Sequence, residues 1–193
     1  MDFGAEDRCR KVSDPFAQSD YAFRIRLLLR DLGIPETYGV DRQLPLQLET
    51  LPSDLESAGV DVFDRPQSLE RQTAKSWSSL RDRALTEGIV LQLASAFRSV
   101  DYQHQIILKK LAGGRDIQEI LRSSAAPGYS EHHTGRAIDI TTPGADPFEE
   151  EFEKTVAFAW LQRCAGDFGF RLSYPRGNPH GVVYEPWHWF KIS

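Results

Sequence analysis

The segment SEHHTGRAID, residues 130–139, places two adjacent histidines within seven residues of an aspartate. The whole chain contains five histidines, so the pair His132 and His133 is a local concentration of this residue type. Gly135 can adopt backbone conformations that other residues avoid, which predicts a turn directly after the histidines. A histidine in that turn and the aspartate beyond it, Asp139, can then approach the same ion.

Hydrophobic and other residues alternate after the turn, and GRAIDI, residues 135–140, is typical of a β-strand. Ala137 and Asp139 then lie on one face of this strand. We expect Ile138 and Ile140, on the other face, to pack in the core. Asp139 is left on a face that can line a cleft.

A second segment with the same kinds of side chain, EPWHW at residues 185–189, lies near the C-terminus. Glu185 precedes His188 by three residues, so a straight strand would put the two side chains on opposite faces. Pro186 has no N–H for a strand ladder, however, and predicts a bulge at this point. Such a bulge brings Glu185 and His188 to the same side of the chain.

Two imidazoles, one ligand carboxylate and one spare carboxylate are the groups that a catalytic zinc site needs. Zinc in such sites binds three protein ligands and keeps a fourth position open for water. It lowers the pKa of that water toward about 7, and a carboxylate outside the metal shell takes the water proton. We therefore expect one Zn²⁺ per chain. Each fragment alone is more commonly a set of hydrogen-bonded polar residues, and their combination indicates the site. The expected ligands are His132, Asp139 and His188, with Glu185 as general base.

Length and composition limit the classes of protein to consider. The 193 residues suffice for one domain with a substantial core, and 40% hydrophobic and 26% charged residues are typical of globular proteins. The formal net charge of −5 gives no sign of the basic face of a nucleic-acid binder. No apolar run reaches the roughly 20 residues of a membrane helix, and the N-terminus lacks a secretory pattern. We expect a cytoplasmic monomer without nucleic-acid partner or membrane span, or a periplasmic or cell-wall protein whose signal has been removed.

Hydrophobic periodicity, glycines and prolines together predict helices and short strands along the chain. The late strands are expected to be mainly antiparallel, which favours an α+β fold with helices packed on a small sheet that carries the zinc site. We expect a single domain over 1–193, with 66–193 as its core and 1–65 as an N-terminal extension to which the sequence assigns no role. The predicted helices are 15–33, 66–88, 99–112, 116–123 and 148–166, and the predicted strands are 46–48, 60–63, 89–97, 135–140, 170–174 and 182–192.

The pattern S-x-H-x-x-G-x-A-x-D (130–139), followed by E-P-W-H (185–188), resembles the VanY-like D-alanyl-D-alanine carboxypeptidases. Their zinc peptidase superfamily also includes D-Ala-D-Ala dipeptidases, L-alanyl-D-glutamate endopeptidases and the hedgehog signalling domain. The similarity extends over roughly residues 66–192 and includes SAFRSVDYQ (95–103) and GFRLSYPRG (169–177).

The resemblance implies the same metal site and adds substrate-binding residues. His132, Asp139 and His188 match the zinc ligands of the family. Glu185 matches the catalytic acid/base. Arg98 matches an arginine that holds the substrate and stabilises the developing oxyanion, and a guanidinium suits both tasks because it is always charged.

Two further positions match substrate-binding residues of the family, Gln103 and Ser130. A polar residue on a helix surface and a cap at a loop end are the common alternatives for these two. His133 stands next to a ligand position, and we expect its side chain to point elsewhere, toward a supporting or a surface position.

The resemblance implies a zinc D,D-carboxypeptidase that hydrolyses the terminal D-Ala-D-Ala bond of peptidoglycan stem peptides or muropeptides. An L,D-carboxypeptidase and a peptidoglycan endopeptidase are alternatives, because the same core motifs serve all of these activities. A non-catalytic binding module stabilised by zinc is an alternative of another class, which the superfamily's signalling domain shows the scaffold permits. The presence of both Glu185 and Arg98 favours an enzyme.

Overall fold

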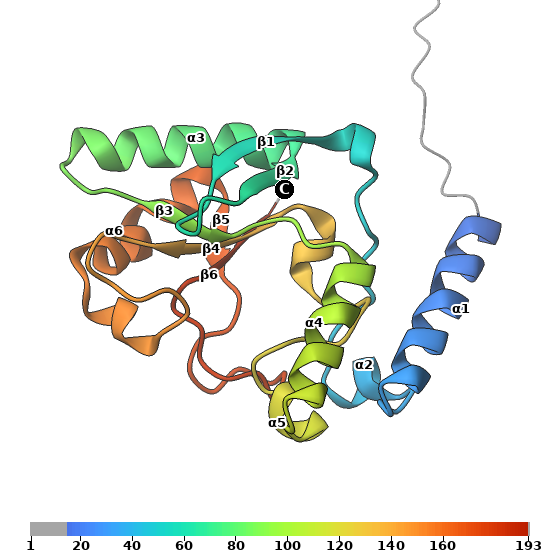
Figure 1. Cartoon of the computed structure of the whole chain (residues 1–193). Helices are drawn as coiled ribbons and strands as arrows, with labels where there is room; N and C mark the ends of the chain where they lie inside the picture. The colour runs from blue at the N-terminus through green and yellow to red at the C-terminus, as the bar shows by residue number, and fades with distance from the viewer. Residues whose placement is uncertain (1–14, 193) are drawn as a thin grey trace, which may run out of the picture.

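The computed structural model describes residues 15–192, with side chains from residue 19 onward (Figure 1). A four-stranded sheet packs against the helix at residues 71–86, a two-stranded ribbon lies beside this helix, and further helices gather to one side of the sheet. The helices are α1 (Pro15–Asp31), α2 (Tyr38–Asp41), α3 (Arg71–Thr86), α4 (Val100–Ala112), α5 (Ile117–Ile120) and α6 (Val156–Cys164). The strands are β1 (Leu55–Val60), β2 (Pro66–Glu70), β3 (Gln92–Ser95), β4 (Ala137–Thr141), β5 (Phe170–Leu172) and β6 (His188–Lys191). The 3-10 turns are η1 (Pro52–Asp54), η2 (Glu131–Thr134), η3 (Glu150–Lys154) and η4 (Ala165–Phe168).

The four-stranded sheet has the order β3-β4-β6-β5, and each neighbouring pair is antiparallel. β1 and β2 form the separate antiparallel ribbon. The predicted α+β fold, with helices on a small antiparallel sheet, is confirmed. The register of the two central strands places Asp139 directly opposite His188.

Two hydrophobic clusters hold the molecule together. One lies between the sheet, α3 and α6 and includes Ile138 and Trp160. The other lies among α1, α2, α4 and α5 and includes Leu29 and Ile107. The described part of the expected N-terminal extension, residues 19–65, therefore completes a core together with helices of the segment that carries the site.

Residues 66–88, predicted as one helix, form two elements. Pro66 opens strand β2, where the first position of a strand needs no N–H from proline. Glu70 then caps α3, because its carboxylate accepts hydrogen bonds from Gln72 N and Thr73 N, each at 3.0 Å. The helix therefore begins one residue after this cap and not at the proline.

Two short strand predictions are wrong. Residues 46–48 have no regular secondary structure. The strand expected at 60–63 lies earlier, as β1, because a turn follows it. The Asp61 carboxylate closes this turn by accepting hydrogen bonds from Phe63 N at 2.9 Å and Arg65 N at 3.0 Å.

The helix predicted for 148–166 is divided by a cap at Thr155. The Thr155 hydroxyl accepts a hydrogen bond from Phe158 N at 3.1 Å and starts α6, and the turns η3 and η4 flank this helix on its two sides. A local side-chain bond thus starts a new helix inside one continuous apolar pattern.

Other helix predictions are close to the structure. α1 and α4 confirm the helices expected at 15–33 and 99–112. Ser99 caps α4 as predicted, with its hydroxyl accepting from Tyr102 N at 3.1 Å. Within residues 15–192, no helix combines the length and the apolar character needed to cross a membrane.

Candidate metal centre

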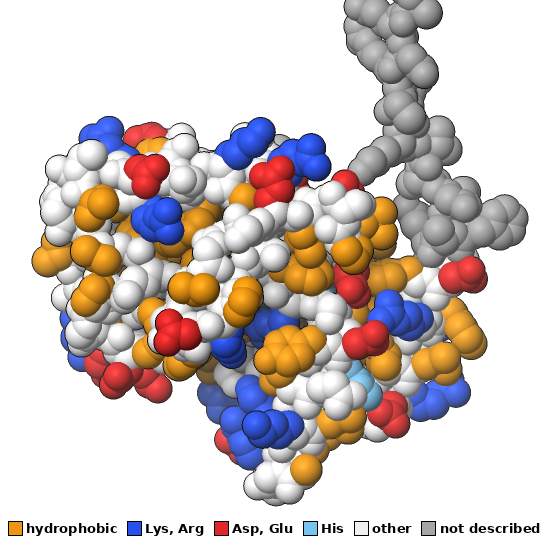
Figure 2. Space-filling model, turned by 45° about the horizontal axis from the view of Figure 1, so that its top comes forward, with side chains coloured by type: hydrophobic (Ala, Val, Ile, Leu, Met, Phe, Trp, Pro, Cys, Tyr) orange, Lys and Arg blue, Asp and Glu red, His pale blue; other side chains and the backbone are white. Residues whose placement is uncertain are grey.

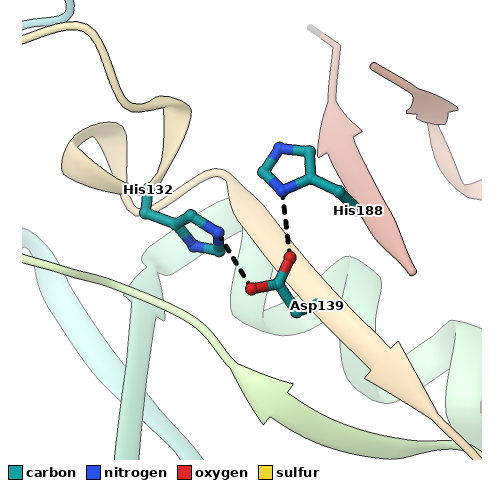
Figure 3. A group of neighbouring side chains, drawn as sticks. All are labelled: His132, Asp139 and His188. Carbon is teal, nitrogen blue, oxygen red and sulfur yellow. Dashed lines mark hydrogen bonds and ion pairs between the residues drawn. The ribbon is translucent and has the colours of Figure 1, made fainter. Parts of the chain in front are cut away.

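Three side chains from separate parts of the chain converge beside the sheet (Figure 3). His132 comes from η2, Asp139 from β4 and His188 from β6. Asp139 Oδ2 lies 3.1 Å from His132 Nε2, and Asp139 Oδ1 lies 2.9 Å from His188 Nδ1. Each residue offers one ligand atom within 4.8 Å of the others, and each is only 3% exposed.

A strand ladder and a tight turn place these residues. Asp139 and His188 are direct partners in the β4–β6 ladder. The predicted turn at Gly135 is present, with a φ of +64°. A Cβ at this position would lie 2.7 Å from Glu70 N, so both the conformation and the space require glycine. The turn returns the chain to β4 so that His132 reaches Asp139.

A second partner orients each imidazole. His132 Nδ1 donates to Ala96 O at 2.6 Å, which leaves Nε2 facing Asp139. His188 Nε2 donates to Glu131 Oε2 at 2.9 Å, which leaves Nδ1 facing Asp139. Metal-binding histidines are commonly oriented in this way, with the second ring nitrogen bonded to a carbonyl or a carboxylate.

Glu131 is a candidate functional residue to which the motif pattern assigned no role. It is 8% exposed, and its carboxylate also accepts hydrogen bonds from Ser173 Oγ at 2.5 Å and Arg171 Nη2 at 3.2 Å. Burial opposes its ionisation, but the bond to His188 lowers the pKa of Glu131 below its usual value. The signal in the sequence was its position directly before His132.

Glu185 lies beside the cluster, next to His188. Its Oε2 is 3.8 Å from His188 Nδ1, and the residue is 7% exposed. His188 N donates to Glu185 O at 3.1 Å, and Glu185 N donates to Tyr174 O at 3.1 Å. This turn replaces a straight strand ahead of β6, so Glu185 and His188 lie on the same side, as the proline at 186 predicted.

Burial and crowded charges shift the pKa values of the site. Burial raises the pKa of Glu185 to about 7, opposed by His188 and reinforced by Asp139. Burial opposes protonation of His188, but hydrogen bonds to Asp139 and Glu131 raise its pKa to about 10. The pKa of Asp139 is held well below its usual range, because its histidine partners outweigh its burial. The carboxylates thus favour a cation at this position.

Arg98 borders the cluster and is held by Gln103. Arg98 Nη1 donates to Gln103 Oε1 at 2.9 Å, and Arg98 Nη2 lies 3.7 Å from Asp139 Oδ2. Gln103 is fully buried, and its Nε2 donates to Ala125 O at 2.7 Å. Both ends of this amide are engaged within the protein, so Gln103 orients the Arg98 guanidinium. Ser130 lines the cleft over the cluster.

His133, next to a ligand position, is buried and links two backbone segments through hydrogen bonds. Its Nδ1 donates to Arg98 O at 2.6 Å, and its Nε2 accepts from Gly128 N at 3.1 Å. These bonds require a neutral ring, and burial lowers the pKa of His133 to about 4. Its side chain points away from the cluster as expected, into the protein interior and not to the surface.

A cleft of about 760 Å³ opens over the cluster. Its lining includes the three candidate ligands, Glu185 and an aromatic group. In this group the Phe148 ring stacks on Phe63 and meets Trp187 edge-on, each at a centroid distance of 6.4 Å. Figure 2 shows Lys and Arg side chains gathered along a hollow on one face of the molecule.

The donor set fits a divalent metal ion. Two imidazoles with anchored second nitrogens and one ionised carboxylate are ligands that zinc accepts, and three protein ligands leave a position for water. Glu185 supplies a further carboxylate, 3.8 Å from His188 Nδ1. An α+β fold that presents such a cluster in an open cleft has the arrangement of a metallohydrolase.

Comparison with known families defines the class further. The family model of VanY, described as D-alanyl-D-alanine carboxypeptidase, matches residues 66–191, which include all three candidate ligands and Glu185. The chain belongs to this family of carboxypeptidases, and the resemblance found in its motifs is confirmed.

Individual relatives support the same assignment. YodJ of Bacillus subtilis (strain 168) is 34% identical over 160 residues, 77% of this chain and 57% of YodJ. The D-alanyl-D-alanine carboxypeptidase of Enterococcus faecalis is 32% identical over 120 residues, 57% of this chain and 43% of that protein. The chain thus spans about half the length of these relatives. The solved structure of the LdcB LD-carboxypeptidase has a TM-score of 0.67 at 27% identity, covering 83% of this chain and 79% of that chain.

Proposed function

We propose that this chain is a zinc-dependent carboxypeptidase that hydrolyses the terminal D-Ala-D-Ala bond of peptidoglycan stem peptides. The observation that carries the proposal is the buried cluster of His132, Asp139 and His188 with the carboxylate of Glu185 beside it. Membership of the VanY family and the similarity to a D-alanyl-D-alanine carboxypeptidase support the choice of bond.

One zinc ion would be held by His132 Nε2, the Asp139 carboxylate and His188 Nδ1, since these atoms face one another. When bound, zinc supplies a water molecule of lowered pKa and polarises the scissile carbonyl. The bonds from the far ring nitrogens to Ala96 O and Glu131 keep both imidazoles in the orientation that binding requires.

Glu185 is the proposed proton carrier. It takes the proton of the attacking water and passes it to the amine of the departing amino acid. Burial raises the pKa of Glu185 to about 7 in the metal-free chain, and a bound zinc ion would favour the ionised form that accepts the water proton.

Arg98 is proposed to stabilise the oxyanion that forms from the scissile carbonyl. Its guanidinium is oriented by Gln103 and borders the cluster next to Asp139, and a fixed cation with free N–H groups suits developing negative charge. Ser130, on the cleft wall, is the proposed substrate-binding hydroxyl. Gln103 is proposed to hold the Arg98 guanidinium in its substrate-binding orientation.

A second candidate is an L,D-carboxypeptidase, which would shorten a tetrapeptide stem where a D,D-carboxypeptidase shortens a pentapeptide. The likeness to the LdcB LD-carboxypeptidase favours this candidate. The two reactions remove the same kind of C-terminal residue with the same catalytic groups, so their difference lies in how the cleft accepts the preceding residue.

The test is a mass spectrum of zinc-loaded protein after incubation with a stem pentapeptide and, separately, with a tetrapeptide. Loss of one alanine from the pentapeptide alone is the expected result. Loss from the tetrapeptide alone moves the assignment to the second candidate. No loss from either peptide, with zinc bound, overturns the carboxypeptidase proposal and leaves an endopeptidase, to be tested on cross-linked peptides, or a non-catalytic binding module.

A further inference from the structure

Four Lys and Arg side chains line the cleft over the cluster, and one of them has no carboxylate partner among residues 19–192. Three are arginines with a carboxylate oxygen at 2.7 to 3.7 Å, namely Arg65, Arg98 and Arg115. The fourth is Lys110 of α4. Among residues 19–192, no carboxylate lies within ion-pair distance of its ammonium group.

Lys110 is partly buried, and its Nζ donates one hydrogen bond, to Ser124 Oγ at 2.6 Å. An ammonium group carries three donors, so two N–H groups remain for a ligand. Ser124 also lines the cleft, which places this contact at the cleft wall. Burial and the cations of Arg115 and Arg98 lower the pKa of Lys110, opposed by Glu185, so its ammonium lies within the field of the catalytic groups.

We propose that Lys110 anchors a second anion-binding position in this cleft, which takes a carboxylate of the peptide substrate. This inference rests on the proposed function, because a stem peptide is the ligand that brings the carboxylate. A partly buried cation without an anion has an unfavourable energy, and a bound carboxylate offsets it with charge-assisted hydrogen bonds.

The carboxylate can come from two places in the substrate. It is either the carboxylate of the C-terminal residue or an acidic group within the stem peptide. Arg98 is held by Gln103 and lies 3.7 Å from Asp139 Oδ2, whereas Lys110 is held by Ser124, so the two cations of the cleft have different partners. In either case Lys110 contributes to substrate choice and not to the chemical step.

The experiment compares three variants of the zinc-loaded full chain. Lys110→Met keeps the aliphatic chain and removes the charge. Lys109→Met makes the same change in net charge at the exposed neighbouring position of α4 and is the matched control. Lys110→Arg retains a cation. Zinc content and melting temperature are measured for each variant to verify that the fold is intact.

Turnover is measured on three peptides, namely a free-acid stem peptide, its C-terminal amide, and a peptide with amidated interior carboxylates. For Lys110→Met we expect kcat/KM on the free acid to fall on the order of 10- to 100-fold, mainly through KM. Lys109→Met should match the unmodified chain, and Lys110→Arg should recover most of the loss. Equal kcat/KM in Lys110→Met and Lys109→Met would overturn the proposal.

The amidated peptides identify the carboxylate. If Lys110 binds the terminal carboxylate, Lys110→Met no longer distinguishes the free acid from the C-terminal amide. If Lys110 binds an interior carboxylate, Lys110→Met no longer distinguishes the free acid from the peptide with amidated interior carboxylates. A loss on the free acid with both preferences unchanged would mean that Lys110 acts through the fold, and would count against the anion-binding position.

Peptide binding to zinc-loaded Glu185→Gln protein separates this inference from the proposed function, because binding needs no turnover. Binding that depends on Lys110 without any turnover by the unmodified chain would support the anion-binding position and overturn the proposed activity. Turnover that is the same with and without Lys110 would support the proposed activity and overturn the anion-binding position. Absence of both peptide binding and turnover would refute both proposals.

Discussion

Glu185 differs from the other carboxylates of the site in its protonation. It lies 3.8 Å from His188 Nδ1, and burial raises its pKa to about 7, whereas the pKa of Asp139 stays well below its usual range. Glu185→Gln preserves the shape of the side chain and removes its capacity to accept a proton. We expect a loss of turnover of about 10²- to 10⁴-fold with zinc retained, measured by peptide hydrolysis and elemental analysis. Glu149→Gln, at the exposed cleft rim, is the control. Turnover unchanged by Glu185→Gln would remove this residue from the mechanism.

Glu131 is a single residue that orients the His188 ring. Because it accepts the Nε2–H bond of His188, its removal should leave that ring free to rotate away from Asp139. We predict that Glu131→Ala lowers zinc affinity about 10- to 100-fold, measured by competition with a chelator. Glu131→Gln should lose less, since an amide oxygen still accepts one hydrogen bond. Affinities in both variants equal to that of the unmodified chain, with intact folds, would contradict a positioning role.

The start of α3 shows how one side chain sets the boundary of an element. Glu70 accepts hydrogen bonds from Gln72 N and from both the amide and the hydroxyl of Thr73. Glu70→Ala should lower the free energy of unfolding by about 1 kcal/mol, measured by urea denaturation at neutral pH. Glu56→Gln, in a surface ion pair with Arg71 at 3.1 Å, should change it by less than about 0.5 kcal/mol.

The Glu70 cap should also be sensitive to acid. Burial opposes ionisation of Glu70, but its hydrogen bonds outweigh burial and lower its pKa below the ordinary value of 4.5. The unfolded chain therefore binds this proton at a higher pH than the folded chain does. The difference in unfolding free energy between the unmodified chain and Glu70→Ala should be full above pH 4.5 and shrink as the pH falls through the lowered pKa. A difference that grows on acidification would exclude the cap.

At the scale of the whole molecule, the buried side chains of the metal cluster bring η2, β4 and β6 together. A metal that binds only the folded chain raises the apparent stability, by about 2.7 kcal/mol at a concentration 100 times the dissociation constant. We predict that zinc raises the melting temperature of apo-protein by roughly 5–10 °C and that a chelator reverses the shift. His132→Ala should abolish the shift, and a shift of equal size in that variant would place the metal elsewhere.

Local sequence patterns predicted the turns and periodicity around the site but not the boundaries of the helices. The helical and strand periods, the turn at Gly135 and the interruption of the last strand at Pro186 follow from backbone rules that act over a few residues. The interruption is a turn ahead of β6 and not the expected bulge. Element boundaries did not follow, because Glu70 and Thr155 start helices through side-chain bonds that compete with the apolar pattern. Helical periodicity alone carries no information about where such a bond forms.

The sequence by itself determined the chemical identity of the site. The motifs of SEHHTGRAID and EPWHW specify two imidazoles and two carboxylates, and the family match agrees with them. Only the tertiary structure decided which partners orient these groups, such as Glu131 on His188 and Gln103 on Arg98. It also decided that Lys110 lines the cleft with no carboxylate partner among residues 19–192. The reason is physical. Ligand types are properties of single residues, whereas orientation, burial and charge pairing depend on strands and helices that meet only after the chain has folded.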